Sequence, residues 1–248
     1  MSKKKLVVSG DSWTAGTAYA GQRLDGPFAG IWPEYLGDML NMDVINVGWG
    51  GVGNEFIYNK IVDELSSIKD IGLAVACWSG HDRWDFNLFG ERRRKTLRID
   101  PSVEDPYTGW IDSEFLNRLK PIVNILLEMN MVSTEHNFFK TLRWYNAFQN
   151  YCESNNIPYM QCSAFNVLSD DVISLMLDHP IFYKMNEDHF YGWPMFSQIG
   201  GFSLSDKLNE VDPERKNLRI SDEDTHPNTE GHKFIAELFY KQYELVYD

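Results

Sequence analysis

The segment Leu6–Trp13 (LVVSGDSW) lies near the start of the 248-residue chain and indicates its fold most directly. Its first three residues form a continuous apolar run, which is typical of a strand buried on both faces of a parallel sheet. Serine and glycine follow at once, so the strand is expected to end in a tight turn. Since ligands bind at the carboxyl ends of strands in such sheets, the polar residues of this turn are candidates for function.

Strands and helices are predicted to alternate after this segment. Apolar runs predict strands at 44–47, 73–78 and 157–162. Helical periodicity and capping residues predict helices at 32–40, from 54 to 65, and at 114–129, 141–154 and 229–243. This order favours a parallel sheet covered by helices on both faces, within one domain that spans 1–248.

Two stretches break the alternation, at about 84–112 and 178–213. The first collects proline, glycine and charged residues and is interpreted as an insertion or lid. The second is dense in aromatic residues between 182 and 196. We interpret those side chains as a hydrophobic cluster in preference to a platform that stacks on a sugar or an apolar acyl group.

Composition excludes several classes of function. The chain has 23 basic and 36 acidic residues and a net charge of −13, which disfavours nucleic acid and anionic membranes as partners. No apolar stretch is long enough to span a membrane, and the basic start is followed by only three apolar residues, which is too short for a signal peptide. A cytoplasmic location is expected, and the oligomeric state is left open.

The three cysteines show no pairing pattern. Cys77, Cys152 and Cys162 lack the CxxC spacing of zinc sites, and their odd number disfavours a disulfide framework. They are expected to be small apolar core residues. His226 and His232 lie six residues apart, which is not a metal-ligand spacing, so no metal site is expected.

Polar residues cluster after the predicted strands. Ser12 follows the first strand, a glycine-rich turn at 48–53 follows the second, and Ser79 to Arg83 follow the third. The sequence DEDTHPN at 222–228 precedes the last helix. Because the carboxyl ends of parallel strands share one edge, these segments should converge. They contain the parts that acyl transfer needs, namely a nucleophile, a base, an acid and oxyanion donors.

These segments resemble the blocks of SGNH or GDSL-type serine hydrolases. Gly10-Asp11-Ser12 matches the first block, Gly51 matches the glycine block, and His226-Pro227 matches the last block. The resemblance implies a three-layer α/β/α fold with a flavodoxin-like parallel sheet of about five strands. It also implies that Ser12 is the nucleophile and His226 the base, and that no cofactor is needed.

Two blocks depart from the family pattern. The asparagine of the third block is replaced by His81, in a segment similar to a variant of some phage-encoded members. In the last block the position three residues before His226 holds Glu223, whereas Asp224 lies two residues before it. We prefer Asp224 over Glu223 as the acid that orients the histidine, and Asp222 ranks third.

The resemblance also assigns the oxyanion donors. The backbone N–H groups of Ser12 and Gly51 are expected to face the oxyanion. The third donor is either a ring N–H of His81 or the side-chain amide of Asn54.

Some polar residues near these segments are expected to have structural roles. Arg83 is expected to pair with Asp82 or Asp85 in preference to substrate. Asn228 is a candidate cap for the last helix, with His232 on the surface of that helix.

The leading hypothesis is an SGNH-type serine esterase that hydrolyses a short, acetyl-like ester on a small molecule or a glycan. Hydrolysis and acyl transfer are not separated by the sequence. The first alternative is a catalytically idle binding or structural module, such as a virion-associated protein, because the third-block asparagine is missing. A flavin or nucleotide binder ranks last, since no phosphate-binding glycine motif is present.

Overall fold

The computed structural model describes residues 3–16, 30–87, 94–99, 107–108, 113–165 and 171–247. Its central sheet is parallel, with strands in the order β2-β1-β3-β7-β8. The strands are β1 (Lys5–Gly10), β2 (Asp43–Asn46), β3 (Ile71–Trp78), β7 (Tyr159–Ser163) and β8 (Phe190–Tyr191). The predicted α/β fold with a five-stranded parallel sheet is confirmed.

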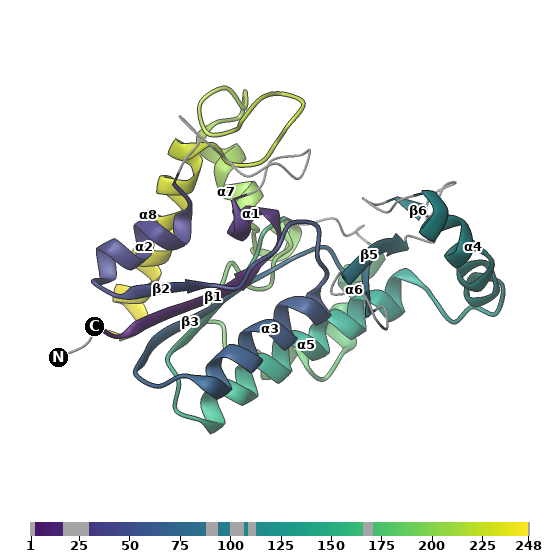
Figure 1. Ribbon diagram of the computed structural model, residues 1–248, viewed down its shortest axis with the longest axis horizontal. Coiled ribbons are helices and arrows are strands. Elements are labelled where there is room, and N and C mark those ends of the chain that lie inside the picture. The colour runs from purple at the N-terminus through teal and green to yellow at the C-terminus, as the bar shows by residue number, and fades with distance from the viewer. Residues whose placement is uncertain are drawn as a thin grey trace.

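Helices cover both faces of this sheet (Figure 1). One face carries α1 (Ser12–Ala15), α2 (Trp32–Leu40), α7 (Leu204–Val211) and α8 (Thr229–Tyr247). The other face carries α3 (Asn54–Ser67), α5 (Thr134–Ser154) and α6 (Asp171–Asp178). The three layers follow from the sequence, because strands apolar on both faces must be covered on both faces.

Two hydrophobic cores result from the alternation of side chains along the strands. In β3, Ala74, Ala76 and Trp78 face the layer of α3 and α5, whereas Leu73, Val75 and Cys77 face the layer of α2 and α8. Each of these residues is fully buried.

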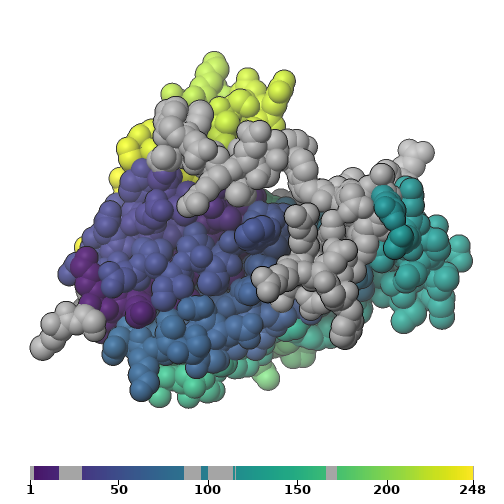
Figure 2. Space-filling view, viewed as in Figure 1, coloured from purple at the N-terminus to yellow at the C-terminus, as the bar shows by residue number. Residues whose placement is uncertain are grey.

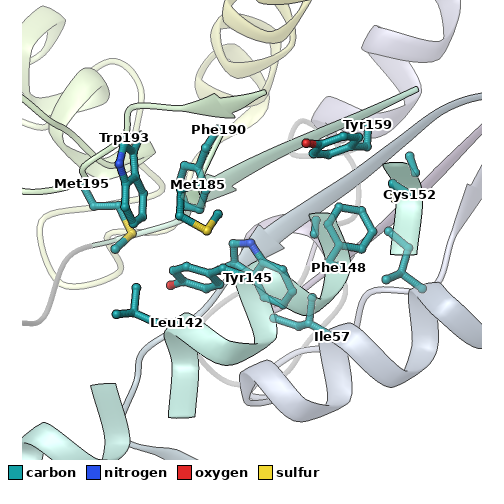
Figure 3. Close-up of a cluster of buried hydrophobic side chains, with 14 of the residues drawn as sticks. Ile57, Leu142, Tyr145, Phe148, Cys152, Tyr159, Met185, Phe190, Trp193 and Met195 are labelled. Atoms are coloured by element: carbon teal, nitrogen blue, oxygen red, sulfur yellow. The ribbon is translucent and has the colours of Figure 1, made fainter. Parts of the chain in front are cut away.

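The predicted aromatic cluster is confirmed and is part of the main core. Figure 3 shows Tyr145 of α5, Phe190 and Trp193 in one cluster of side chains. The ring centroid of Phe190 lies 5.3 Å from that of Tyr145 and 5.1 Å from that of Trp193. Phe190 and Phe196 are each 1% exposed. Phe190 and Phe196 therefore fill the layer beneath the sheet and are not available as a stacking platform, whereas Tyr183 in the same stretch is 74% exposed.

The second irregular stretch contains more regular structure than its sequence predicts. Within 178–213 lie β8, α7 and two short 3-10 helices, Phe182–Lys184 and Ser197–Ile199. A strand of two residues is too short to show periodicity. Helix α7 begins at Ser203, whose hydroxyl accepts from Asp206 N while the Asp206 carboxylate accepts from Ser203 N, a capping box that the sequence analysis missed.

The described part of the first stretch is a small antiparallel sheet. Its strands are β4 (Arg83–Asn87), β5 (Arg94–Ile99) and β6 (Tyr107–Thr108), and the remainder of 84–112 lies outside the described residues. Helix α4 (Ser113–Glu128) packs on it through Val123, Leu97 and Ile99. This unit projects from one end of the molecule (Figures 1 and 2).

Most predicted boundaries lie close to the observed ones. Helix α8, however, ends at Tyr247 and not at 243, and α5 begins at Thr134 and not at 141. Ser133 caps it by accepting a hydrogen bond from His136 N at 3.0 Å. Burial of Cys77, Cys152 and Cys162 as free thiols confirms their assignment to the core. Within the described residues, no helix is both long and apolar enough to cross a bilayer.

Candidate active site

The turn after β1 is held in a fixed conformation around Ser12. Asp11 caps α1 by accepting a hydrogen bond from Trp13 N at 3.1 Å. Gly10 permits the close approach of the strands, because a Cβ there would lie 2.9 Å from the carbonyl oxygen of Cys77 and 2.1 Å from Thr14 Oγ1. The side chain of Ser12, at the first position of α1, is buried.

Two hydrogen bonds connect three side chains at this turn. His226 Nε2 lies 2.7 Å from Ser12 Oγ, and His226 Nδ1 lies 2.5 Å from Asp224 Oδ1. Asp224 Oδ1 also accepts from the backbone N–H of His226 at 3.1 Å. Of the acids considered, the structure brings Asp224 to the imidazole, whereas Asp222 and Glu223 are exposed.

A tight loop between α7 and α8 carries both Asp224 and His226. Ile220 N donates to the carbonyl of His226 at 3.0 Å, and Arg219 forms an antiparallel bridge with Pro227. Asn228 closes the loop, since its side-chain amide donates to the carbonyl of Arg219 at 2.9 Å. The same side chain accepts from Gly231 N at 3.0 Å, which agrees with its predicted role as a helix cap.

The glycine-rich turn after β2 is bonded to the Ser12 segment. Asn46 Nδ2 donates to the carbonyl of Thr14 at 2.8 Å, and Asn46 Oδ1 accepts from Gly48 N at 2.9 Å. Trp49 N donates to the carbonyl of Gly10 at 2.9 Å. Gly51 has φ +78°, a left-handed conformation that favours glycine. This turn therefore lies at the same sheet edge as Ser12.

Asn54 supports the turn after β3. Its Oδ1 accepts from Ser79 N at 2.8 Å, and its Nδ2 donates to the carbonyl of Ser79 at 3.1 Å and to Thr141 Oγ1 at 3.2 Å. Both amide hydrogens of Asn54 are thus used within the fold, which disfavours it as an oxyanion donor. His81, two residues beyond Ser79, is buried on the same turn.

The prediction that Arg83 pairs with Asp82 or Asp85 is wrong. Arg83 Nη1 lies 3.1 Å from Asp11 Oδ2 and donates to the carbonyl of Val52 at 3.0 Å. Asp82 instead pairs with Arg98 at 2.6 Å, and Asp85 accepts from the backbone N–H groups at the start of α3. The sequence could not show this, because Asp11 lies on a distant strand end and is fully buried there.

Asp11 also joins the first and third blocks, a role that the sequence analysis did not assign. Its Oδ2 accepts from Ser79 Oγ at 2.8 Å in addition to Arg83. The carboxylate thus bonds the turn that carries Ser12 to the turn that carries His81. Its position inside the GDS sequence was the available signal.

His232 is not on the surface, as the sequence suggested, but 1% exposed. Its Nδ1 accepts a long hydrogen bond from Trp32 N at 3.4 Å. Burial, with a smaller contribution from the charge of His226, lowers the pKa of His232 to about 3. His232 is therefore neutral at physiological pH. The described residues contain no group of three histidines, cysteines or acids arranged to hold a metal ion.

Comparisons with known proteins establish the fold. No family model and no curated protein matches the chain. The crystal structure of TesA matches with a TM-score of 0.51 at 10% identity, over 98% of this chain and 99% of that one. A carbohydrate acetylesterase family member from Sinorhizobium meliloti matches with a TM-score of 0.46 at 13% identity, over 98% of both chains.

A member of the lipolytic protein G-D-S-L family from Veillonella parvula matches with a TM-score of 0.42 at 12% identity, over 96% of this chain and 97% of that one. At these identities the likeness concerns the fold alone. As a likeness of fold, the predicted resemblance to SGNH/GDSL-type hydrolases is confirmed.

Proposed function

We propose that this protein is a serine esterase that hydrolyses a short, acetyl-like ester of a small molecule or a glycan. The observation that carries the proposal is the pair of hydrogen bonds from Ser12 Oγ to His226 Nε2 and from His226 Nδ1 to Asp224. A serine hydroxyl is a poor nucleophile until a base removes its proton, and an imidazole serves best when a carboxylate fixes its tautomer.

The reaction proceeds in two halves. Ser12 Oγ attacks the acyl carbon while His226 Nε2 takes the hydroxyl proton, and the carbonyl electrons move to the oxygen. When the tetrahedral intermediate collapses, the alcohol leaves with the proton from His226 and the acyl group stays on Ser12. A water molecule then gives a proton to His226 and attacks the acyl-serine. When this second intermediate collapses, His226 returns the proton to Ser12 Oγ and the carboxylic acid is released.

Backbone and side-chain donors stabilise the oxyanion in this proposal. The Ser12 N–H lies at the first position of α1, where helix N–H groups have no intrahelical partner. The Gly51 N–H belongs to a turn that Asn46 and Trp49 bond to the Ser12 segment. His81 supplies the third donor, because the hydrogen bonds of Asn54 are used elsewhere.

Chemical labelling tests the proposal directly. The protein is treated with a fluorophosphonate and its intact mass is measured, in parallel with turnover of p-nitrophenyl acetate. A single adduct that is absent in Ser12→Ala, together with turnover that the same variant lacks, is expected. Ser67→Ala is the matched control, because Ser67 is an exposed serine of α3 whose hydroxyl donates only to the carbonyl of Glu64 in the same helix, at 2.9 Å.

A catalytically idle binding or structural module is the second candidate. The observation that favours it is His81 at the position where the family carries an asparagine. Absence of both the adduct and turnover in the wild-type protein would support this candidate and contradict the esterase.

A further inference from the structure

Arg219 is a buried cation next to the candidate site. It is 2% exposed, and no carboxylate pairs with it among the described residues. Burial, and to a smaller extent the charge of Arg215, lowers the pKa of Arg219 to about 10 against the opposing charges of Asp212 and Asp206, so the guanidinium is still protonated at neutral pH. Burying a charge without a direct ion pair is costly. The contacts of the Arg219 guanidinium indicate what its buried charge does.

The hydrogen bonds of Arg219 connect two parts of the fold. Nη1 donates to the carbonyl of Thr225 at 2.7 Å, and Thr225 directly precedes His226. Nη2 donates to the carbonyl and hydroxyl oxygens of Ser205, each at 3.1 Å, and to Asn209 Oδ1 at 3.0 Å. Ser205 and Asn209 belong to α7. The Arg219 guanidinium thus connects the loop that carries His226 to helix α7 through hydrogen bonds.

The same guanidinium also packs on the residue that follows Ser12. Its Cζ lies 5.0 Å from the centroid of the Trp13 ring, a distance typical of cation–π contacts. Trp13 is 4% exposed and its backbone N–H is bonded to Asp11. Arg219 is therefore in contact with both segments that must meet for Ser12 and His226 to react.

We infer that Arg219 is a positioning residue that sets the distance between Ser12 Oγ and His226 Nε2 by binding Thr225 on one side and Trp13 on the other. This inference rests on the proposed esterase function. Arginine suits the role because its planar fork donates in several fixed directions while its face stacks on an aromatic ring. Lysine has neither the fork nor the flat face.

The test compares Arg219→Lys and Arg219→Met with wild type. Misplacement of a reacting group by about 1 Å costs on the order of 10²-fold in rate. We expect kcat for p-nitrophenyl acetate to fall on the order of 10²-fold in Arg219→Met and by less in Arg219→Lys, with KM nearly unchanged. A loss confined to KM, or unchanged kcat in both variants, would overturn the inference.

Tyr247→Phe is the matched control for lost stability. Tyr247 lies in α8 at the opposite end of the sheet, where its hydroxyl bonds the N–H and the carbonyl of Tyr159. The control should lower the melting temperature and leave kcat unchanged. If it lowers kcat as much as Arg219→Met does at equal destabilisation, Arg219 has only a structural role.

Hydrogen exchange keeps the inference testable even if the wild-type protein is inactive. Amide exchange across 219–228 should accelerate in Arg219→Met, whereas exchange in the sheet strands should match that of wild type. Unchanged exchange across 219–228 would overturn the positioning role whatever the activity. An inactive wild-type protein with faster exchange in the variant would contradict the esterase proposal alone.

Discussion

Asp224 and Glu223 are neighbours in sequence, but only Asp224 contacts the imidazole of His226. Asp224→Asn should lower kcat on the order of 10³–10⁴-fold, because an amide at this place holds the wrong tautomer of the histidine. Glu223→Gln removes one charge from the adjacent, exposed position and should leave kcat unchanged. Steady-state turnover of p-nitrophenyl acetate measures both. Equal effects of the two variants would contradict the assignment of the acid.

His81 offers a second test at the level of single residues. His81→Ala should lower kcat on the order of 10²–10³-fold, the usual cost of removing one oxyanion donor. His81→Asn keeps an N–H donor and should retain more of the activity. Thermal unfolding of both variants serves as the control for folding. If kcat is the same in His81→Ala as in wild type, His81 is not a donor.

The buried His232 predicts a pH dependence of stability. Its pKa is lowered from 6.5 to about 3 in the folded protein, so between these values the unfolded chain binds a proton that the folded chain excludes. The free energy of unfolding contributed by this group therefore falls as pH decreases, by about 2 kcal/mol between pH 7 and pH 5.

Urea unfolding at the two pH values measures this contribution. In His232→Gln, which keeps an acceptor for Trp32 N, the decrease between pH 7 and pH 5 should be smaller by about 2 kcal/mol. Identical pH dependence in the variant and in wild type would show that His232 titrates normally in the folded state.

Single residues also show the limit of what sequence can predict. Ser12, Gly51, Asp224 and His226 were identified from their places within short motifs, and the structure brings Ser12, Asp224 and His226 together. Arg219 carries no motif, since it acts through a bond to a backbone carbonyl and a ring contact. Such a role depends on three-dimensional proximity, which one sequence does not encode in any local pattern.

At the scale of elements, helix α3 is capped by a residue from another element. Its N-cap residue is Gly53, which has no side chain, and the carboxylate of Asp85 in β4 accepts from the N–H groups of Gly53 and Phe56, each at 2.9 Å. The Asp85 carboxylate also accepts from Thr96 Oγ1 at 2.7 Å. The small antiparallel sheet is thereby bonded to the start of α3.

Removing this cap should destabilise the protein. Asp85→Ala should lower the free energy of unfolding by about 1–2 kcal/mol, the usual range for loss of a helix cap. Thr96→Val removes only the hydroxyl contact to Asp85 and should cost less. Urea unfolding of both variants makes the comparison, and an equal or smaller loss in Asp85→Ala would contradict the capping role.

The sequence predicted helices and strands correctly where the hydrophobic pattern extends over many residues. It missed elements that depend on contacts with residues far away in the sequence. The apolar runs of β1 and β3 and the helical faces of α2 and α3 are local patterns, so their sequences sufficed. The strand β8 has only two residues and exists because Phe190 and Tyr191 pair with β7. The start of α5 depends on a cap at Ser133, which a hydrophobic pattern does not reveal.

At the scale of the whole molecule, the order of the strands determines where the site forms. In the order β2-β1-β3-β7-β8 the chain turns from one side of β1 to the other, and the turns after β1 and β3 meet at that switch point. Asp11 bonds to Ser79 across this junction. The alternation of strands and helices predicted the convergence, whereas the bonds that fix its geometry required coordinates.

The cysteines allow the cooperativity of the whole fold to be measured. Cys152 lies in the core beneath one face of the sheet, and Cys77 and Cys162 lie in the core of the other face. Burial raises the pKa of both the Cys152 and the Cys162 thiols, so the reactive thiolate is suppressed in the folded state.

We therefore expect no thiol to react with Ellman's reagent in the native protein, and all three to react when the chain unfolds. Variants that retain only Cys152 or only Cys77 report the two layers separately. Because both layers pack on the same strands, their labelling rates should rise at the same urea concentration and with the same slope. Labelling of Cys152 at a clearly lower urea concentration than Cys77 would show instead that the layer of α3 and α5 detaches before the sheet unfolds.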